Sequence, residues 1–149
     1  MNCIFCKNKV TEVTNSRPSK HGKVVWRRRS CGSCKEVFTT QESFSYDSLF
    51  VIKRNLSRKR FIYEKLFASV FDALSGGKDH DMGDSALKAK LLSQDIIDDL
   101  LSIRSKYISS KEIIIATHRT LHKENSFFAT KYSMYSEYRM DTIKKLFKR

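Results

Sequence analysis

Four cysteines in two close pairs constrain this chain more than any other feature of its sequence. Two residues separate Cys3 from Cys6 and Cys31 from Cys34, and 24 residues lie between the pairs. Paired thiolates at this spacing are typical of a tetrahedral Zn²⁺ site with Zn–S distances of about 2.3 Å. Four protein ligands leave no position for water. We therefore predict one structural Zn²⁺ per chain, with two disulfides or four free thiols as the alternative.

Size and charge narrow the possible functions. The chain has 149 residues, a formal net charge of +13 and 40% hydrophobic residues, which is enough apolar material for a folded core. Such an excess of Lys and Arg favours polyanionic partners. The sequence has no apolar run of about 20 residues that could span a bilayer and no signal-peptide pattern, so we expect a soluble, cytoplasmic protein with no membrane partner.

Three common catalytic motifs are missing from the sequence. It contains no Walker lysine loop, no G-x-S-x-G elbow and no convincing Cys-His nucleophile arrangement. We therefore expect a binding protein and not an enzyme.

The composition of the chain changes between residues 43 and 48, after all four cysteines, and we place a domain boundary there. We expect a zinc ribbon over residues 1–45, a second domain over 46–140 and a basic tail over 141–149. Strand-like runs bounded by turn residues predict three strands, at residues 10–15, 24–30 and 37–45, with a turn at 18–22.

Apolar spacing predicts that the second domain is mostly helical. A strand is expected at residues 50–54, and residues 56–60 either form its hairpin partner or lead into a helix. Helical periodicity covers residues 58–74, 86–107, 111–123 and 127–138. Gly76-Gly77 is expected to end the first helix, residues 78–84 to form a loop, and Ser109 with Glu112 to form a capping box for the third. The predicted fold class is α+β.

Basic and polar residues are dense between and just after the cysteine pairs. On a strand, Arg27 and Arg29 share one face and Arg28 projects from the other, so at least one face can contact phosphates. The alternative is a solvated charge run with Trp26 as a core residue. The candidate DNA-binding residues are Ser16, Arg17, Lys23, Arg27, Arg28, Arg29, Lys35, Thr39 and Thr40.

These segments resemble a known family. The strings Cys3-Ile-Phe-Cys6, Asn15-Ser16-Arg17, Arg27-Arg28-Arg29-Ser-Cys31-Gly-Ser-Cys34 and Phe38-Thr39-Thr40-Gln41-Glu42 are similar to the N-terminal zinc ribbon of the NrdR transcriptional repressors, which regulate bacterial ribonucleotide reductase genes. The resemblance implies a rubredoxin-like ribbon of three short strands that binds double-stranded operator DNA.

In that family the ribbon is followed by an ATP-cone, a nucleotide-binding regulatory domain with a small β-hairpin. Residues 51–55 with Phe61 look like its opening, and residues 128–138 look like its last helix. The resemblance implies that ATP or dATP binds here and controls DNA affinity through homo-oligomerisation. The implied nucleotide-binding residues are Lys53, Arg54 and Lys65, facing the phosphates, and Val51, near the base.

Two departures from the family leave an alternative open. Arg60 stands where an acidic residue is usual. Leu56 stands where a turn glycine is usual, and a turn that requires a positive φ disfavours leucine, whereas a type I turn accepts it. The alternative is a zinc-ribbon nucleic-acid-binding protein whose degenerate cone no longer binds nucleotide and serves for oligomerisation or protein partners. Charge alone also fits an RNA-binding or transcription-machinery factor.

Two further patterns have ordinary explanations. His118 and His122 are four residues apart on a predicted helix, which is a metal-site spacing, but we interpret them as surface or satisfied histidines. Tyr132, Tyr135 and Tyr138 are expected to be core or interface residues and not a stacking platform.

Overall fold

The N-terminal part of the chain forms a three-stranded antiparallel sheet, as the strand signals predicted. The first strand is longer than the predicted residues 10–15 and includes Pro18, the predicted start of the turn; residues 20–21 of that turn lie outside the described residues. The strands are β1 (Thr11–Pro18), β2 (Val24–Cys31) and β3 (Val37–Ser43), in the order β1-β2-β3. The register between β1 and β2 shifts between Val13 and Asn15, which marks a β-bulge. The predicted third strand is two residues too long, because pairing with β2 ends at Ser43.

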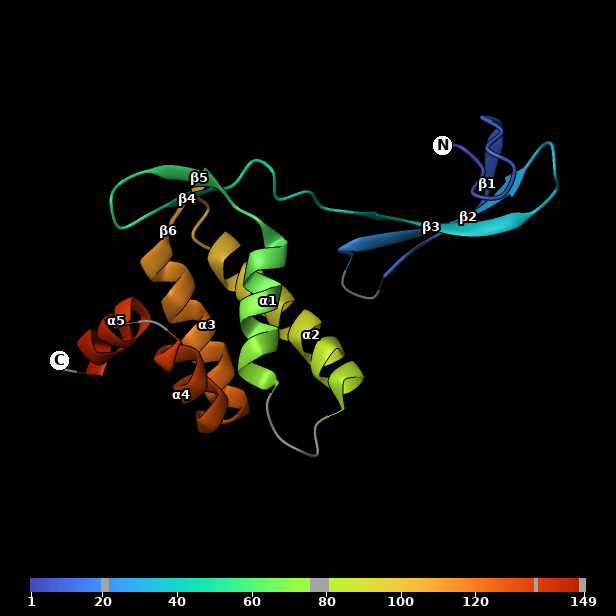
Figure 1. Cartoon of the computed structure of the whole chain (residues 1–149). Helices are drawn as coiled ribbons and strands as arrows, with labels where there is room; N and C mark the ends of the chain where they lie inside the picture. Colours follow the sequence, from blue (N-terminus) through green and yellow to red (C-terminus); the bar gives the residue numbers. More distant parts are fainter. Residues whose placement is uncertain (20–21, 76–80, 136, 148–149) are drawn as a thin grey trace. The chain divides into compact units, whose positions relative to one another are not determined.

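The computed structural model shown in Figure 1 describes residues 1–19, 22–75, 81–135 and 137–147. The chain divides into unit 1, Met1–Ser45, and unit 2, Tyr46–Arg149. The helix stop predicted at Gly76-Gly77 and the last two residues of the predicted basic tail lie outside the described residues.

Unit 1 has very little hydrophobic core. Its buried cluster consists of Cys3, Cys31 and Phe38, with Cys34 packed against it. Most of the side chains on β1 and β3 are exposed. A module of this size cannot fold stably on so small an apolar core, so the metal ligands must supply part of its stability.

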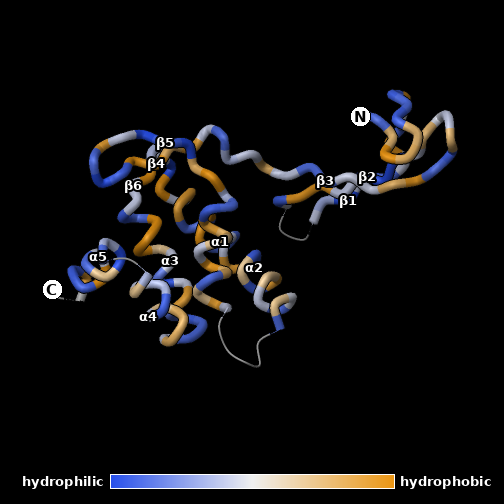
Figure 2. Tube along the Cα trace, viewed as in Figure 1, coloured by the Kyte–Doolittle hydropathy of each residue, from blue (hydrophilic) through white to orange (hydrophobic). Residues whose placement is uncertain are grey.

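Unit 2 begins with a small mixed sheet. β4 (Phe50–Ile52) pairs with β5 (Arg58–Arg60) in an antiparallel hairpin and with β6 (Tyr107–Ser109) in parallel. Figure 2 shows the contrast between the hydrophilic β5, Arg-Lys-Arg, and the apolar β4 beside it. Residues 56–60 thus form the hairpin partner, and not the start of a helix.

The helices among the described residues of unit 2 lie on one side of this sheet (Figure 1). They are α1 (Tyr63–Leu74), α2 (Met82–Leu101), α3 (Ser110–Glu124), α4 (Ser126–Met134) and α5 (Glu137–Phe147). Their apolar faces enclose one core together with Val51 of β4 and Ile108 of β6. The predicted α+β class is confirmed, and so is the capping box of α3, in which Ser109 and Glu112 bond each other's backbone N–H.

Several predicted helix boundaries were wrong. The helix predicted from residue 58 begins at Tyr63, because residues 58–60 pair with β4. The helix predicted over 86–107 runs from Met82 to Leu101 instead. Asp81 caps its start by accepting a hydrogen bond from the backbone N–H of Gly83, so part of the predicted loop 78–84 is helical. The last residue of the predicted helix, Tyr107, belongs to β6 instead, a strand that the sequence analysis did not predict.

The final predicted helix is two helices. α4 ends at Met134 and α5 begins at Glu137, so the continuous helix predicted over 127–138 is interrupted, and residues 141–147 of the predicted tail belong to α5. Tyr132 lies in α4 and Tyr138 in α5. Among the described residues, no helix is both long and apolar enough to cross a membrane.

Candidate metal centre and nucleic-acid interface

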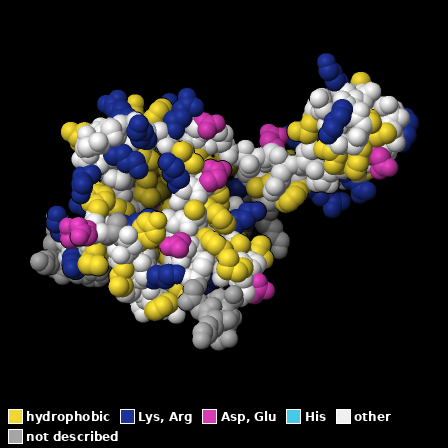
Figure 3. Space-filling model, in the orientation of Figure 1, with side chains coloured by type: hydrophobic (Ala, Val, Ile, Leu, Met, Phe, Trp, Pro, Cys, Tyr) yellow, Lys and Arg dark blue, Asp and Glu magenta, His cyan; other side chains and the backbone are white. Residues whose placement is uncertain are grey.

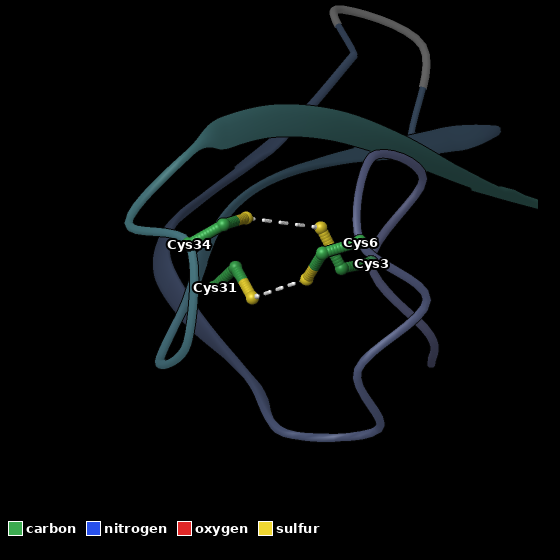
Figure 4. A group of neighbouring side chains, drawn as sticks. All are labelled: Cys3, Cys6, Cys31 and Cys34. Atoms are coloured by element: carbon green, nitrogen blue, oxygen red, sulfur yellow. Dashed lines mark hydrogen bonds between the residues drawn. The ribbon is translucent and has the colours of Figure 1, made fainter.

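Four sulfur atoms converge at one end of unit 1 (Figure 4). The Sγ atoms of Cys3, Cys6, Cys31 and Cys34 all lie within 4.8 Å of one another. Cys3 is 3.7 Å from Cys34 and Cys6 is 3.6 Å from Cys31, from sulfur to sulfur. A tetrahedral ion with Zn–S bonds of about 2.3 Å requires sulfurs about 3.8 Å apart. The cluster therefore fits one Zn²⁺, and none of the four cysteines forms a disulfide.

The backbone around each cysteine pair has the same geometry. The backbone N–H of Lys7 donates to the carbonyl of Cys3, and that of Lys35 donates to the carbonyl of Cys31. Both lysines have a positive φ, of 62° and 61°. This left-handed residue after the second cysteine closes each turn so that the two thiols point the same way. The paired turns explain why two residues must separate the cysteines.

The thiols influence one another's protonation. The backbone N–H of Cys34 is the main cause that lowers the pKa of Cys31 to about 6. For Cys34, the backbone N–H of Glu36 acts to lower the pKa, but burial and the neighbouring sulfurs outweigh it and raise the pKa to about 12. Four thiolates cannot share so small a volume without a cation. Zinc supplies that charge and holds all four ligands deprotonated.

The sheet register divides the predicted DNA-binding residues between two faces. Arg27 lies opposite Ser16 and Thr40, and Arg29 follows it on the same face, which we call the Arg27 face. Arg27 forms an ion pair of 2.7 Å with Glu42, and Nε of Arg29 donates to Oγ1 of Thr40. These two arginines thus already have partners within the sheet.

The opposite face, which we call the Trp26 face, is open. Arg28 lies opposite Asn15 and Thr39, and Trp26 lies opposite Arg17 and Gln41. All six side chains are exposed, including 48% of Trp26, so Trp26 is not the core residue of the alternative interpretation. Lys23 precedes β2 and Lys35 lies in the second cysteine turn, so neither belongs to a strand.

Unit 2 contains a cavity of about 940 Å³. Val51, Lys53, Arg54 and Lys65, the four residues implied by the family resemblance, all line it. Figure 3 shows Lys and Arg side chains gathered around an apolar hollow on this face of unit 2. Its cationic lining residues are Lys53, Arg54, Lys59, Arg60, Lys65 and Arg139, and apolar ones include Val51, Phe61, Leu66, Ile113, Ile114 and Tyr132.

Aromatic rings orient two of these cations. The guanidinium of Arg54 lies 5.3 Å from the ring centroid of Tyr138. Arg139 lies 4.2 Å from the ring of Tyr132 and 4.6 Å from that of Tyr135. Such cation–π contacts position a guanidinium without neutralising it. The sequence analysis missed Arg139, because the break between α4 and α5 that turns it toward the cavity has no clear sequence signal.

The turn between β4 and β5 has the conformation that the family glycine would favour. Leu56 has a φ of 62° and is 80% exposed. The backbone N–H of Leu56 donates to the carbonyl of Lys53, and that of Lys53 donates to Ser57. Leu56 is the last residue of a β-turn that begins at Lys53, and it does not avoid a positive φ there. Leucine adopts this φ at a cost of about 1–2 kcal/mol.

The histidine pair lies on α3, and the tyrosine row extends from α4 to α5. The rings of His118 and His122 are 6.0 Å apart on α3, and no third metal-binding side chain joins them among the described residues. Tyr132 is a core residue, as predicted, whereas Tyr135 is 68% exposed.

Fold and site together define a zinc-ribbon protein whose basic ribbon is joined to a helical unit with a cationic cavity. The pattern of the family described as "Transcriptional repressor NrdR-like, N-terminal domain" matches residues 1–42. A protein named Transcriptional repressor NrdR from Kosmotoga olearia is 31% identical over 152 aligned positions, which cover 98% of this chain and 93% of that protein. The chain belongs to the NrdR family of transcriptional repressors, as its resemblance indicated.

Two further relatives with the same name support this assignment. The protein from Thermobifida fusca is 36% identical over 76% of this chain and 69% of its own length. The protein from Polynucleobacter necessarius is 31% identical over 80% of this chain and 72% of its own length. The family consists of repressors and not of enzymes, which agrees with the expectation from the motifs.

Proposed function

We propose that this chain represses transcription by binding double-stranded operator DNA through the Trp26 face of its zinc ribbon, in the cytoplasm. The observation that carries the proposal is the exposed row formed by Arg17, Arg28, Thr39 and Gln41 around Trp26. In the major groove, Arg can bind guanine by two hydrogen bonds, and Thr or Gln can contact other base edges. Ribonucleotide reductase genes are the proposed targets, by family inheritance.

The Arg27 face has a different role in this proposal. Arg27 pairs with Glu42, and Arg29 bonds Thr40, so both arginines stabilise the sheet and add positive potential. Ser16 shares this face, and Lys23 and Lys35 lie outside the strands. Contacts from these residues would be to phosphates, which position a protein without reading sequence.

Arg28 provides the test. We expect Arg28→Ala to weaken binding to a promoter duplex by about 1–3 kcal/mol. Arg28→Lys keeps the charge but loses the paired hydrogen bonds, so it should retain affinity for a scrambled duplex and lose preference for the promoter. Fluorescence anisotropy over a range of salt concentrations measures both. Unchanged promoter preference in both variants would reject the Trp26 face, and equal affinity for structured RNA would favour an RNA-binding factor.

We further propose that ATP or dATP binds in the cavity and controls DNA affinity by selecting one homo-oligomer over another. Lys53, Arg54 and Lys65 would contact the phosphates, and Val51 would lie near the base. Support comes from their common position in the lining of a cationic cavity. The nucleotide must bind one assembly more tightly than the other, since equal affinity shifts no equilibrium.

The strained turn at Leu56 favours a second candidate, in which the cone no longer binds nucleotide and serves only for oligomerisation or protein partners. The two candidates differ in how nucleotide affects heat stability. A ligand that binds only the folded state raises its stability, by about 2.7 kcal/mol at 100 times its Kd. Protection by ATP or dATP, but not by phosphate, would support nucleotide control, and no protection would support the second candidate.

A further inference from the structure

We infer that the cavity of unit 2 binds its nucleotide as the free polyanion and not as the Mg²⁺ complex. This inference rests on the nucleotide binding proposed above. The family resemblance implies ATP or dATP as the ligand but not whether Mg²⁺ accompanies it. The side chains that line the cavity favour the Mg²⁺-free form.

The lining is cationic. Six Lys and Arg side chains line the cavity, from the β4–β5 hairpin, α1 and α5, and no acidic side chain lines it among the described residues. A nucleoside triphosphate carries roughly four negative charges at neutral pH, because its terminal phosphate adds about 1.5–2 and each of the other two phosphates adds about one. The protein alone can therefore neutralise the triphosphate.

The carboxylates near the lining residues in the sequence are not part of the lining. Glu137 and Asp141 are exposed on α5, close in sequence to the lining residues of that helix, and neither lines the cavity. Glu64 is exposed in the first turn of α1 and is not part of the lining. The carboxylate of Glu112 accepts a hydrogen bond from the backbone N–H of Ser109, with an N–O distance of 2.6 Å, in the capping box of α3. Sites that bind Mg²⁺ with a nucleotide usually offer one or two carboxylates besides the phosphates. The described lining offers none.

Backbone groups add to the positive potential. Ile62, the residue before α1, lines the cavity, and no side chain caps the start of this helix. In contrast, side chains cap α2, α3 and α4, through Asp81, Ser109 and Asn125. Free N–H groups at a helix start favour an anion. They reinforce the attraction that the six cationic side chains already provide.

Bound Mg²⁺ would cancel about half of the ligand's charge and so weaken each of these attractions. Each attraction between a phosphate and an exposed cation is modest, but the loss recurs at several cations and adds up. The nucleotide should therefore bind about tenfold or more tightly without Mg²⁺, a difference of about 1.4 kcal/mol.

Isothermal titration calorimetry on the full-length, zinc-loaded chain tests this inference. ATP as its sodium salt is titrated in Mg²⁺-free buffer and in excess MgCl2, at equal ionic strength set with NaCl, and without a chelator because a chelator would remove the zinc. We expect Mg²⁺ to raise the Kd at least about tenfold. Equal Kd values, or binding that needs Mg²⁺, would overturn the inference alone. No binding in either buffer would overturn the proposed nucleotide binding as well.

Lys59→Glu tests the role of the lining, because it places a carboxylate in the cavity. This variant should bind ATP more weakly in Mg²⁺-free buffer and show a much smaller rise in Kd with Mg²⁺. Lys90→Glu makes the same charge change on the exposed surface of α2, outside the lining, and should behave like the wild type. If both variants respond alike, net charge and not the lining sets the Mg²⁺ effect, and the inference fails. Circular dichroism checks that each variant is folded.

Discussion

Backbone conformation at single residues has clear consequences in this protein. Lys7, Lys35 and Leu56 all have φ values near +60°, where side chains with a Cβ are disfavoured. The first two lie in the metal-binding turns, where four Zn–S bonds fix the backbone. Leu56 has no such support: its side chain is 80% exposed and its turn joins two strands of three residues.

Leu56→Gly should therefore stabilise unit 2. Glycine removes the left-handed penalty, and little burial is lost, so we expect a gain of about 1 kcal/mol in the free energy of unfolding. Urea denaturation of the zinc-loaded protein measures the gain. Leu56→Ala is the matched control, because alanine loses the same side chain but retains the Cβ penalty. A similar gain in both variants would mean that the exposed leucine, and not its φ, is unfavourable.

At the scale of elements, α3 carries a half-buried histidine, His118, one turn before the exposed His122. Burial is the main cause that lowers the pKa of His118, and the neighbouring His122 lowers it further. A lowered pKa in the folded state means that the unfolded chain binds the proton more readily. The contribution to stability is complete above the ordinary value of 6.5 and is lost as pH falls below it.

We therefore expect unit 2 to become less stable between pH 7.5 and pH 5.5, the range around the ordinary pKa of histidine. His118→Gln cannot be protonated and should show a smaller decrease in melting temperature over this range. His122→Gln should retain most of the decrease, because burial and not His122 is the larger cause at His118. Equal pH dependence in wild type and His118→Gln would show that other groups are responsible.

Sequence reasoning worked where local chemistry decides the structure and failed where distant contacts do. The spacing of Cys3, Cys6, Cys31 and Cys34 defines the metal cluster, and the capping box at Ser109 is encoded within four residues. In contrast, β6 has only three residues and forms because Ile108 pairs with Val51, far away in the sequence. No periodicity marks so short a parallel strand.

In the candidate site, too, the sequence predicted what local chemistry decides and not what distant contacts decide. Strand alternation correctly separated Arg28 from Arg27 and Arg29. The pairing of Arg27 with Glu42 required the register between β2 and β3, which the sequence does not give. The cavity residues came from family resemblance, whereas the contribution of Arg139 depends on the break between α4 and α5.

For the whole molecule, the two units depend on different sources of stability. Among the described residues of unit 1, the buried cluster consists of the metal ligands Cys3 and Cys31 with Phe38, whereas unit 2 has a continuous hydrophobic core of strands and helices. Loss of zinc should therefore affect the two units unequally.

Zinc removal by a strong chelator should unfold the ribbon and abolish promoter binding, while unit 2 keeps its helices. Far-UV circular dichroism should lose little helical signal, because every helix among the described residues lies in unit 2. Readdition of Zn²⁺ should restore DNA binding. Cys31→Ser should resemble the chelated protein, whereas retention of promoter binding after complete zinc loss would contradict a structural role for the metal.

We propose that the zinc-loaded repressor changes its subunit number when ATP or dATP binds. Native mass spectrometry of the full chain, alone and with ATP, dATP or their mixture, reports zinc, nucleotide and subunit numbers together. We predict one zinc per chain, bound nucleotide and a subunit number that changes with the nucleotide supplied. One zinc per chain with no bound nucleotide and an unchanged assembly would contradict nucleotide control, and would leave a zinc ribbon joined to a cone that serves only for partner contacts.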